Sequence, residues 1–413
     1  MKFTFIANND FDGVGQTAVN LSNNLNLMGQ KCEVLVLHKK FKNNNTTILK
    51  RSLFKRLLLF FFNFLKKDFN ELFGIGYSVI NFDYLKKKLI GTDVVVIFTF
   101  YKVISNDQLE KIFNLNKIVY LRPLDIEMAT GGCHFNNFCV KFKNSCNNCP
   151  KFNFSNWVKF PEINLNKKKK IIKKYKPRVL VQNKYVKSIF DQSNIFKKIK
   201  KDILYIGTNA IRSKKISKDL AKKYLGINKN EKIVLFATFN LNSFIKGGHL
   251  LKESIKILDN DKKLNNKIKI RFLTLGNKNG FDIETKNIKW THLDVTKSNQ
   301  ELNYILRASD TMVCPSLFCF GPHIVEEALL NEVPVVAFNL GSAQEFVKNG
   351  LNGYLIKKYD TRKYANAIKK IITKEKFVFS KLQYKIIKKK CSADSEVRKL
   401  VGLAQEDLDK KIV

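Results

Sequence analysis

The chain has 413 residues, of which 45% are hydrophobic, enough to bury the cores of two domains of roughly 200 residues each. This composition excludes an intrinsically disordered chain. The longest apolar run, residues 57–62, is far shorter than the roughly 20 residues of a membrane-spanning helix. The opening MKFTFIANND lacks the apolar centre of a signal peptide. We therefore expect a cytoplasmic protein in a reducing compartment, where disulfides rarely persist.

The net charge of +40 points to an anionic partner, but only nine of the 75 basic residues are arginine. Recognition of phosphates and base edges favours the forked guanidinium of arginine, so nucleic acid is the weaker interpretation. The excess of lysine is typical of compositional drift toward A/T-rich codons. A surface of this kind can also contact an anionic membrane, and that interpretation stays open.

Short apolar runs rich in β-branched residues alternate with segments of helical periodicity. The first series predicts strands over residues 2–7, 32–38, 93–100, 117–121, 178–182 and 202–207. The second series predicts strands over residues 232–239, 269–276, 310–316, 333–338 and 353–356, with helices near 248–258, 299–308, 322–332 and 343–348. This alternation is typical of parallel sheets covered on both faces. We therefore predict an α/β fold with two doubly wound domains.

The two series meet near residues 207–215, which predicts one domain over residues 1–207 and another over 208–378. A lysine-rich helical tail is expected over residues 379–413. Doubly wound domains bind ligands at the carboxyl ends of their strands. With two such domains, we expect the ligand site in the cleft between them.

Two glycine-containing turns lie between a predicted strand and a predicted helix. Gly13 and Gly15 follow the first strand, and backbone N–H groups in such a turn can approach an anion or a sugar. A tight turn with no ligand explains the same residues equally well. Lys246 and Gly247 follow the strand at 232–239, where a lysine would face phosphates held at the helix start.

The segment PSLFCFGPHIVEEALLNEVPVVAF, residues 315–338, carries the strongest signal. It predicts a strand end, a helix start at Gly321 and Pro322, and Glu326 and Glu327 in the second turn. Neighbouring helical residues point about 100° apart, so one glutamate can face a cleft while the other faces solvent. Two surface charges are the alternative interpretation.

With the residues that follow it, this segment resembles the nucleotide-sugar-binding part of the retaining, GT-B-fold glycosyltransferases of family four, also called group 1. FIKGG resembles their donor-phosphate motif, and the turn at Gly13 resembles their acceptor loop. PLDIEMATGGCHFNNFC…CNNCP resembles a subset with an LHDM- or MDME-type run followed by TGGCH and CxxCP. The match runs in order over about residues 1–375.

The resemblance implies metal-independent transfer of a sugar from a nucleotide-sugar donor, whose base it does not identify, to a glycan or lipid-linked acceptor in surface polysaccharide biosynthesis. Glu327 would hold ribose hydroxyls, Lys246 would neutralise the diphosphate, and Asp125 would face the acceptor as the third catalytic residue. The implied donor-binding set is Gly247, Cys319, Phe320, Gly321, Pro322, His323, Glu327 and Glu345. The implied acceptor-binding set is Gly13, Gly15, Asp125, Thr130 and His134.

The chain departs from the family pattern at several of these positions. Cys319 stands where the family has the first acid of its glutamate pair, and a thiol cannot accept a hydroxyl hydrogen bond as a carboxylate does. Leu241 and Ile245 occupy the places of the phosphate-motif arginine, and Leu124 replaces a histidine. A drifted active enzyme and an inactive homologue that still binds the nucleotide-sugar are both consistent with these changes.

Cys133, Cys139, Cys146 and Cys149 have the spacing C-x5-C-x6-C-x2-C. A structural zinc site, free buried thiols and disulfides all remain open, and each would pin an irregular loop on the acceptor side. His134 is either packed within this loop or contacts a ligand or the acceptor.

The apolar and basic segment 51–67 is either a membrane-surface segment, which would place the protein at the inner face of the cytoplasmic membrane, or a core helix. The run 167–176 predicts a solvated helix face.

Overall fold

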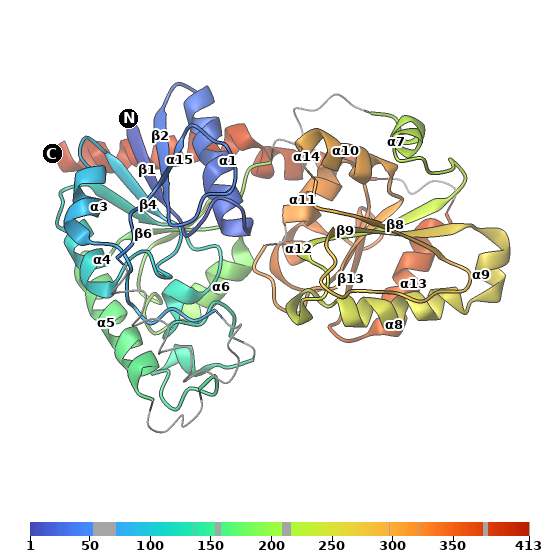
Figure 1. Ribbon diagram of the computed structural model, residues 1–413, viewed down its shortest axis with the longest axis horizontal. Helices are drawn as coiled ribbons and strands as arrows, with labels where there is room; N and C mark the ends of the chain where they lie inside the picture. Colours follow the sequence, from blue (N-terminus) through green and yellow to red (C-terminus); the bar gives the residue numbers. More distant parts are fainter. Residues whose placement is uncertain are drawn as a thin grey trace. The chain divides into compact units, whose positions relative to one another are not determined.

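The computed structural model describes residues 1–52, 72–136, 138–152, 158–208, 216–296, 298–321, 323–374 and 379–412 (Figure 1). These residues form two compact units. Unit 1 contains residues Met1–Tyr205 and Glu396–Val413, and unit 2 contains Ile206–Ser395. Most of the apolar-basic segment at 51–67 lies outside the described residues.

Unit 1 is built on a parallel seven-stranded sheet with strand order β3-β2-β1-β4-β5-β6-β7. Its strands are β1 (Lys2–Ile6), β2 (Lys31–Val36), β3 (Thr46–Ile48), β4 (Val94–Ile97), β5 (Ile118–Leu121), β6 (Arg178–Val181) and β7 (Lys201–Ile203). The central strands β4, β5 and β6 are buried at every position, as expected for a sheet covered on both faces.

Helices cover both faces of this sheet, with α3, α4 and α5 on one side and α1 on the other (Figure 1). The helices are α1 (Gly13–Leu27), α3 (Phe82–Lys88), α4 (Asn106–Phe113), α5 (Phe160–Tyr175), α6 (Lys184–Gln192) and α15 (Ala393–Ile412), with short 3-10 turns η1 (Glu127–Ala129) and η2 (Lys141–Lys143). Helix α4 begins at a capping box in which Ser105 and Gln108 satisfy each other's backbone N–H groups.

The last helix, α15, packs into the core of unit 1 together with α1 and strands β1, β2 and β4. Val397, Leu400 and Ala404 supply its buried apolar face. The fully buried Arg122 donates to Glu396 at 2.9 Å and to the carbonyl of Leu180 at 3.0 Å. The C-terminal helix is therefore an integral part of the first unit.

Unit 2 is built on a parallel six-stranded sheet with strand order β10-β9-β8-β11-β12-β13. Its strands are β8 (Lys232–Asn240), β9 (Ile270–Asn277), β10 (Lys289–Leu293), β11 (Thr311–Cys314), β12 (Val335–Phe338) and β13 (Gly353–Ile356). Because β8 and β11 are neighbours, the loops after their carboxyl ends meet at one edge of the sheet.

Helices α8, α9 and α13 lie on one side of this sheet, and α7, α10, α11 and α14 lie on the other (Figure 1). The helices are α7 (Lys218–Tyr224), α8 (Gly248–Asp259), α9 (Lys262–Lys267), α10 (Asn299–Ala308), α11 (His323–Leu330), α12 (Gly341–Phe346), α13 (Thr361–Ile372) and α14 (Lys381–Cys391), with the 3-10 turn η4 (Phe244–Lys246) before α8.

The predicted α/β fold with two doubly wound domains is confirmed, since both sheets are wholly parallel. The division falls between Tyr205 and Ile206, close to the predicted position. The region predicted as a helical tail, residues 379–413, contains α14, which belongs to unit 2, and α15, most of which belongs to unit 1. The apolar face of α15 is buried against the sheet of unit 1.

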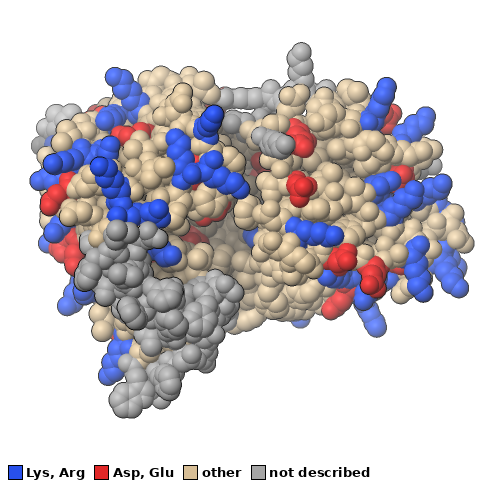
Figure 2. All heavy atoms as spheres, in the orientation of Figure 1, with Lys and Arg blue, Asp and Glu red and all other residues tan. Residues whose placement is uncertain are grey.

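Among the described residues, no helix is both long enough and apolar enough to cross a membrane. On the face shown in Figure 2, Lys and Arg side chains spread over both units, with Asp and Glu side chains among them. The basic side chains of this face do not form the continuous stripe typical of nucleic-acid-binding proteins.

Candidate functional site

In unit 2, the loop after β8 brings Lys246 and Gly247 to the carboxyl end of the sheet. Gly247 has φ +72°, and a Cβ added there would lie 1.9 Å from the carbonyl oxygen of Pro315. Only glycine therefore permits this close approach of the two loops. Helix α8 begins at the next residue, and its N-terminus has no side-chain cap among the described residues.

The loop after β11 packs directly on this turn. The Leu317 N–H donates to the carbonyl of Ile245 at 2.9 Å, and Lys246 Nζ contacts Cys319 Sγ at 4.0 Å. Cys319 and Phe320 are buried, and Gly321 is half-buried. The lysine and the cysteine of the predicted donor set are thus neighbours, while Pro322 lies outside the described residues.

Glu326 and Glu327 both lie partly buried in α11, which differs from the prediction that one of them faces solvent. Burial raises the pKa of Glu327 to about 7, although a hydrogen bond from the Thr208 side chain opposes this shift. Burial also raises the pKa of Glu326 to about 8, and the charges of Glu327 and Glu345 add to the effect. Glu326 Oε2 has no hydrogen-bond partner among the described residues.

His323 and Glu345 are two further residues of the predicted donor set. His323 is the first residue of α11, half-buried beside the loop that carries Cys319. Glu345, in α12, forms an ion pair with Lys390 of α14 at 2.9 Å, and its side chain is only 8% exposed. The contact ties α12 to α14.

In unit 1, the turn at Gly13 and Gly15 differs from the predicted ligand-binding turn. The Asp12 carboxylate caps α1 and accepts the N–H of Gly15 at 2.7 Å, so this donor is already used. A Cβ at Gly15 would lie 2.0 Å from the carbonyl oxygen of Asn9, whereas one at the exposed Gly13 would meet nothing within 4 Å. Close packing therefore explains Gly15, and only Gly13 leaves open space for a ligand.

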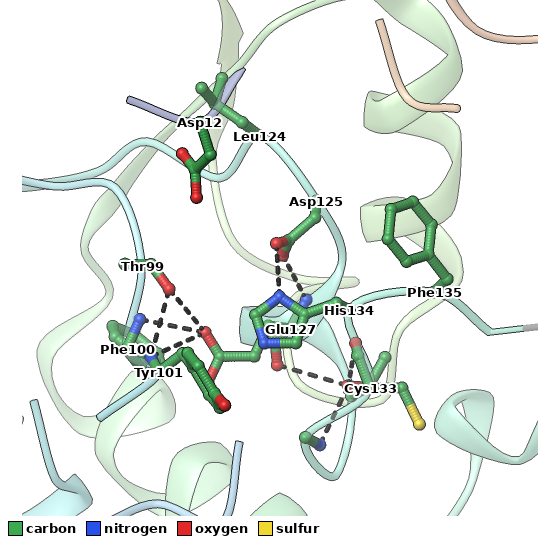
Figure 3. A network of polar contacts seen from close by, with 12 residues as sticks. Asp12, Thr99, Phe100, Tyr101, Leu124, Asp125, Glu127, Cys133, His134 and Phe135 are labelled. Atoms are coloured by element: carbon green, nitrogen blue, oxygen red, sulfur yellow. Dashed lines mark hydrogen bonds and ion pairs between the residues drawn. The ribbon is translucent and has the colours of Figure 1, made fainter. Parts of the chain in front are cut away.

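Asp125 and His134 form the centre of a polar network in unit 1 (Figure 3). His134 Nδ1 lies 2.7 Å from Asp125 Oδ2, while the Nε2 atom is buried without a hydrogen-bond partner among the described residues. Burial acts to lower the pKa of His134, but the charge and hydrogen bond of Asp125, with a contribution from Glu127, raise it above its ordinary value. Asp125 therefore acts to stabilise the imidazolium form of the ring against the effect of burial.

Glu127 also belongs to this network, near the His134 ring. Its Oε2 atom accepts the backbone N–H groups of Phe100 and Tyr101 at 3.0 and 3.2 Å and the Thr99 hydroxyl at 3.2 Å. The Tyr101 ring meets His134 edge-on, with centroids 5.1 Å apart. In Figure 3, Asp12 and Leu124 lie beyond Asp125 from the ring.

Thr130 and Lys168 support the loop that carries His134. The buried Thr130 hydroxyl lies 3.0 Å from the carbonyl of Cys133, so it braces the loop in place of the predicted acceptor contact. Lys168 donates to the carbonyl of Glu127 at 2.7 Å and is fully buried. The solvated helix face predicted over residues 167–176 is therefore wrong at this position, because the ammonium finds its partner inside the unit.

The four cysteines of the loop line one small cavity of about 10 Å³. All eight cysteines of the chain are free thiols in the structure, so the disulfide interpretation is not found. The Cys133 thiol is hydrogen-bonded to Cys149 and buried, which places its pKa well above the ordinary value, and burial raises the pKa of Cys146 to about 11. Cys133 and Cys149 also share a buried apolar cluster with Phe73 and Phe152.

The placement of the described side chains gives the zinc interpretation no support. Zinc requires deprotonated thiolates in a tetrahedral set. Among the described residues, no group of three or more Cys, His, Asp or Glu side chains is placed to hold a metal ion. Free buried thiols that pin the loop are the interpretation that the geometry supports.

Sequence reasoning missed three residues of these networks. Glu127 was detectable, because it is the last acid of the MDME-like run that drew attention to Asp125. Thr208 and Ser342 were not detectable in the sequence, because neither residue belongs to a recognisable motif. Ser342 lies buried in α12, and its side chain acts to lower the pKa of Glu326 against the effect of burial.

Solved structures similar to this chain define its fold. Sucrose-phosphate synthase from Thermosynechococcus elongatus matches with a TM-score of 0.70 and 13% identity, over 99% of this chain and 100% of that one. Anabaena HepE in complex with UDP-glucose matches with a TM-score of 0.66 and 13% identity, over 99% and 100%. WaaG, a glycosyltransferase involved in lipopolysaccharide biosynthesis, matches with a TM-score of 0.62 and 10% identity, over 96% and 94%. The two Rossmann-like units have the GT-B fold.

The sequence comparison concerns unit 2. Residues 217–390 match the model of the family described as glycosyl transferases group 1. A comparison with curated protein sequences gives no significant match. Together, the family match and the GT-B fold support the resemblance to group 1.

Proposed function

We propose that the protein is a glycosyltransferase that moves a sugar from a nucleotide-sugar donor to a glycan or lipid-linked acceptor, with retention of configuration and without a catalytic metal. The proposal depends on one observation: Lys246 and Cys319 meet at the carboxyl ends of β8 and β11, inside the segment that matches group 1. Ligands of doubly wound units bind at this edge.

Lys246 and the start of α8 supply the positive charge that a diphosphate needs. The ammonium lies at the turn before α8, and the uncapped first turn of that helix presents backbone N–H groups. Charge that develops on the departing diphosphate is stabilised by such fixed donors. This arrangement supports chemistry that requires no metal ion.

Glu327 is the proposed ribose ligand. Its carboxyl group interacts with the Thr208 hydroxyl, a contact that a ribose hydroxyl can replace. Because burial raises its pKa to about 7, formation of charge-assisted hydrogen bonds to the ribose would favour the ionised form. Donor binding should therefore release protons near neutral pH.

The Asp125–His134 pair is the proposed acceptor contact in unit 1. His134 Nε2 is buried and has no partner among the described residues, and Asp125 fixes the ring through Nδ1. An imidazolium held in this way donates a hydrogen bond to an acceptor hydroxyl or phosphate. A lipid-linked acceptor of surface polysaccharide synthesis would place the protein at the cytoplasmic face of the membrane.

Cys319 favours a second candidate, a homologue that binds the nucleotide-sugar without turning it over. The thiol occupies the position of the first acid, and its neighbour in the structure is Lys246, which would lack a carboxylate partner there. The third interpretation, a nucleic-acid-binding protein, depends on net charge alone. On the face that Figure 2 shows, acidic side chains lie among the basic ones.

A thermal-shift screen against UDP-, GDP-, ADP- and CMP-sugars tests donor binding. We expect stabilisation by one nucleotide class, a large loss of that shift in Glu327→Gln, and no loss in Glu253→Gln. Glu253 is an exposed residue of α8, so it controls for the change of charge. Stabilisation that is equal in both variants would remove Glu327 from the site.

Turnover of the stabilising donor separates the two candidates. Release of nucleoside diphosphate, with an anomeric proton signal in the product that matches the donor configuration, supports retaining transfer. Donor binding with no turnover, even with membrane-extracted acceptors, supports the non-catalytic homologue. In that case, Cys319→Glu is the variant to assay next, since it restores the acid of the family pattern.

A further inference from the structure

Helix α14 (Lys381–Cys391, KLQYKIIKKKC) has five lysines and no acidic residue. Successive helical residues lie about 100° apart, which places Leu382, Lys385, Ile386 and Lys389 on one arc about 100° wide. On the opposite side, Ile387 and Cys391 are buried at 0% and 1% exposure. The helix therefore has one face in the core of unit 2 and one face that combines apolar and basic side chains.

Two apolar residues of the outer face are exposed. Leu382 is 66% exposed and Ile386 is 38% exposed, one helical turn apart. Lys385 and Lys389 are also exposed, and neither forms an ion pair with an acidic side chain among the described residues. The lysine that is paired, Lys390, points away from this arc toward Glu345.

A cavity adjoins the basic part of this face. Lys385, Lys388 and Lys389 line a hollow of about 380 Å³ together with Ser392, Ala393, Thr208 and the single acid Asp394. Ser392 caps the first turn of α15 by accepting the N–H of Ser395 at 3.2 Å, so the positive end of that helix dipole lies at the same place. A group with one or two negative charges suits such a hollow.

We propose that the outer face of α14 docks on an anionic phospholipid bilayer, with Leu382 and Ile386 in the headgroup region and the cavity around a lipid phosphate. An exposed apolar pair surrounded by unpaired lysines is the arrangement of helices that lie in a membrane surface. A second copy of the chain would bring like charges together. Nucleic acid would leave the apolar pair without a partner, and α14 contains no arginine.

The test measures binding of the full chain to vesicles of phosphatidylcholine alone and of phosphatidylcholine with phosphatidylglycerol, by co-sedimentation and without any nucleotide-sugar. We expect binding to the anionic vesicles that weakens with salt. Removing two lysines with Lys385→Gln and Lys389→Gln should weaken it at least about tenfold, since each lysine near an anionic surface contributes roughly 1 kcal/mol. Leu382→Gln with Ile386→Gln should also weaken it.

The matched control is Lys262→Gln with Lys263→Gln, which removes the same charge from exposed positions of α9 in the same unit. Equal loss in this control would mean that net charge alone drives binding, and would overturn the proposal. Binding that survives in both α14 variants and disappears in Leu58→Ser, Phe60→Ser and Phe64→Ser would assign the contact to segment 51–67 instead. Binding to a DNA duplex but not to vesicles would likewise refute it.

The docking proposal does not rest on sugar transfer. Vesicle binding is measured without donor or acceptor, and the thermal-shift screen is measured without lipid. A chain that binds donors but not vesicles refutes only the α14 proposal. A chain that binds vesicles but no donor refutes only the proposed function.

Discussion

Replacement of Gly247 by alanine is the sharpest test of the proposed donor site. The residue has φ +72°, a conformation that costs a non-glycine residue on the order of 1 kcal/mol. The added Cβ would also lie 1.9 Å from the carbonyl oxygen of Pro315, so the two loops must separate by about 1.1 Å to reach the 3.0 Å below which Cβ contacts are not seen. This movement would pull Lys246 away from Cys319.

A displacement of about 1 Å at a reacting centre can lower a rate by about 100-fold. We therefore expect Gly247→Ala to lose the donor-induced thermal shift and about two orders of magnitude of turnover. The matched control is Gly226→Ala. Gly226 has φ +64°, and a Cβ there would meet nothing within 4 Å, so this variant carries the backbone strain without the clash.

The assay compares melting temperature, donor-induced shift and turnover for the two variants and the unchanged protein. We expect a moderate loss of stability in both variants and a loss of donor binding only in Gly247→Ala. If Gly247→Ala keeps the full donor-induced shift, the contact between the two loops does not position the donor, and the reasoning fails.

Three further predictions concern titration, thiols and the C-terminal helix. The folded-state pKa of Glu326, about 8, lies above its ordinary value, so unfolding releases a proton and stability falls as pH rises from about 4.5 to 8. Glu326→Gln should therefore be more stable than the unchanged protein at pH 8 and lose that advantage by pH 5; equal melting curves at both values would contradict this. Elemental analysis should find no stoichiometric zinc, and all eight thiols should react with a thiol reagent in denaturant, whereas one zinc per chain would restore the metal interpretation. Glu396→Ala leaves the buried Arg122 unpaired and should cost about 3–5 kcal/mol in denaturant unfolding. The control is Glu406→Ala at an exposed ion pair, which should lower the free energy of unfolding far less. Equal losses would show that the buried pair contributes no more to stability than the exposed one.

Much of the fold follows from periodicity in the sequence, because parallel strands buried on both faces are nearly continuous apolar runs. Strands such as β8 and β12 are recognisable in the sequence as runs of this kind. The sequence analysis missed β3 and β10, both at sheet edges, where exposed and polar side chains interrupt the apolar pattern. The role of α15 was also hidden, since an amphipathic helix does not indicate which sheet it will cover.

The candidate site was predictable where a residue belongs to a motif with fixed spacing. Lys246 and Cys319 are 73 residues apart, yet adjacent strands bring them into contact. Hydrogen bonding and burial were not readable from the sequence. Lys168 is buried within a run of lysines because its partner, the carbonyl of Glu127, lies 41 residues away in the sequence.

Because the C-terminal helix α15 returns to unit 1, the core of that unit is completed late in synthesis. The core of unit 1 requires Val397, Leu400 and Ala404, which the ribosome adds after the whole of unit 2, complete at Ser395. Unit 1 therefore cannot complete its core until all of unit 2 has been synthesised, unlike a domain that folds as soon as it emerges. During that interval, the apolar face that α15 will cover stays exposed, and a chain cut short by a few turns of helix would keep it exposed permanently.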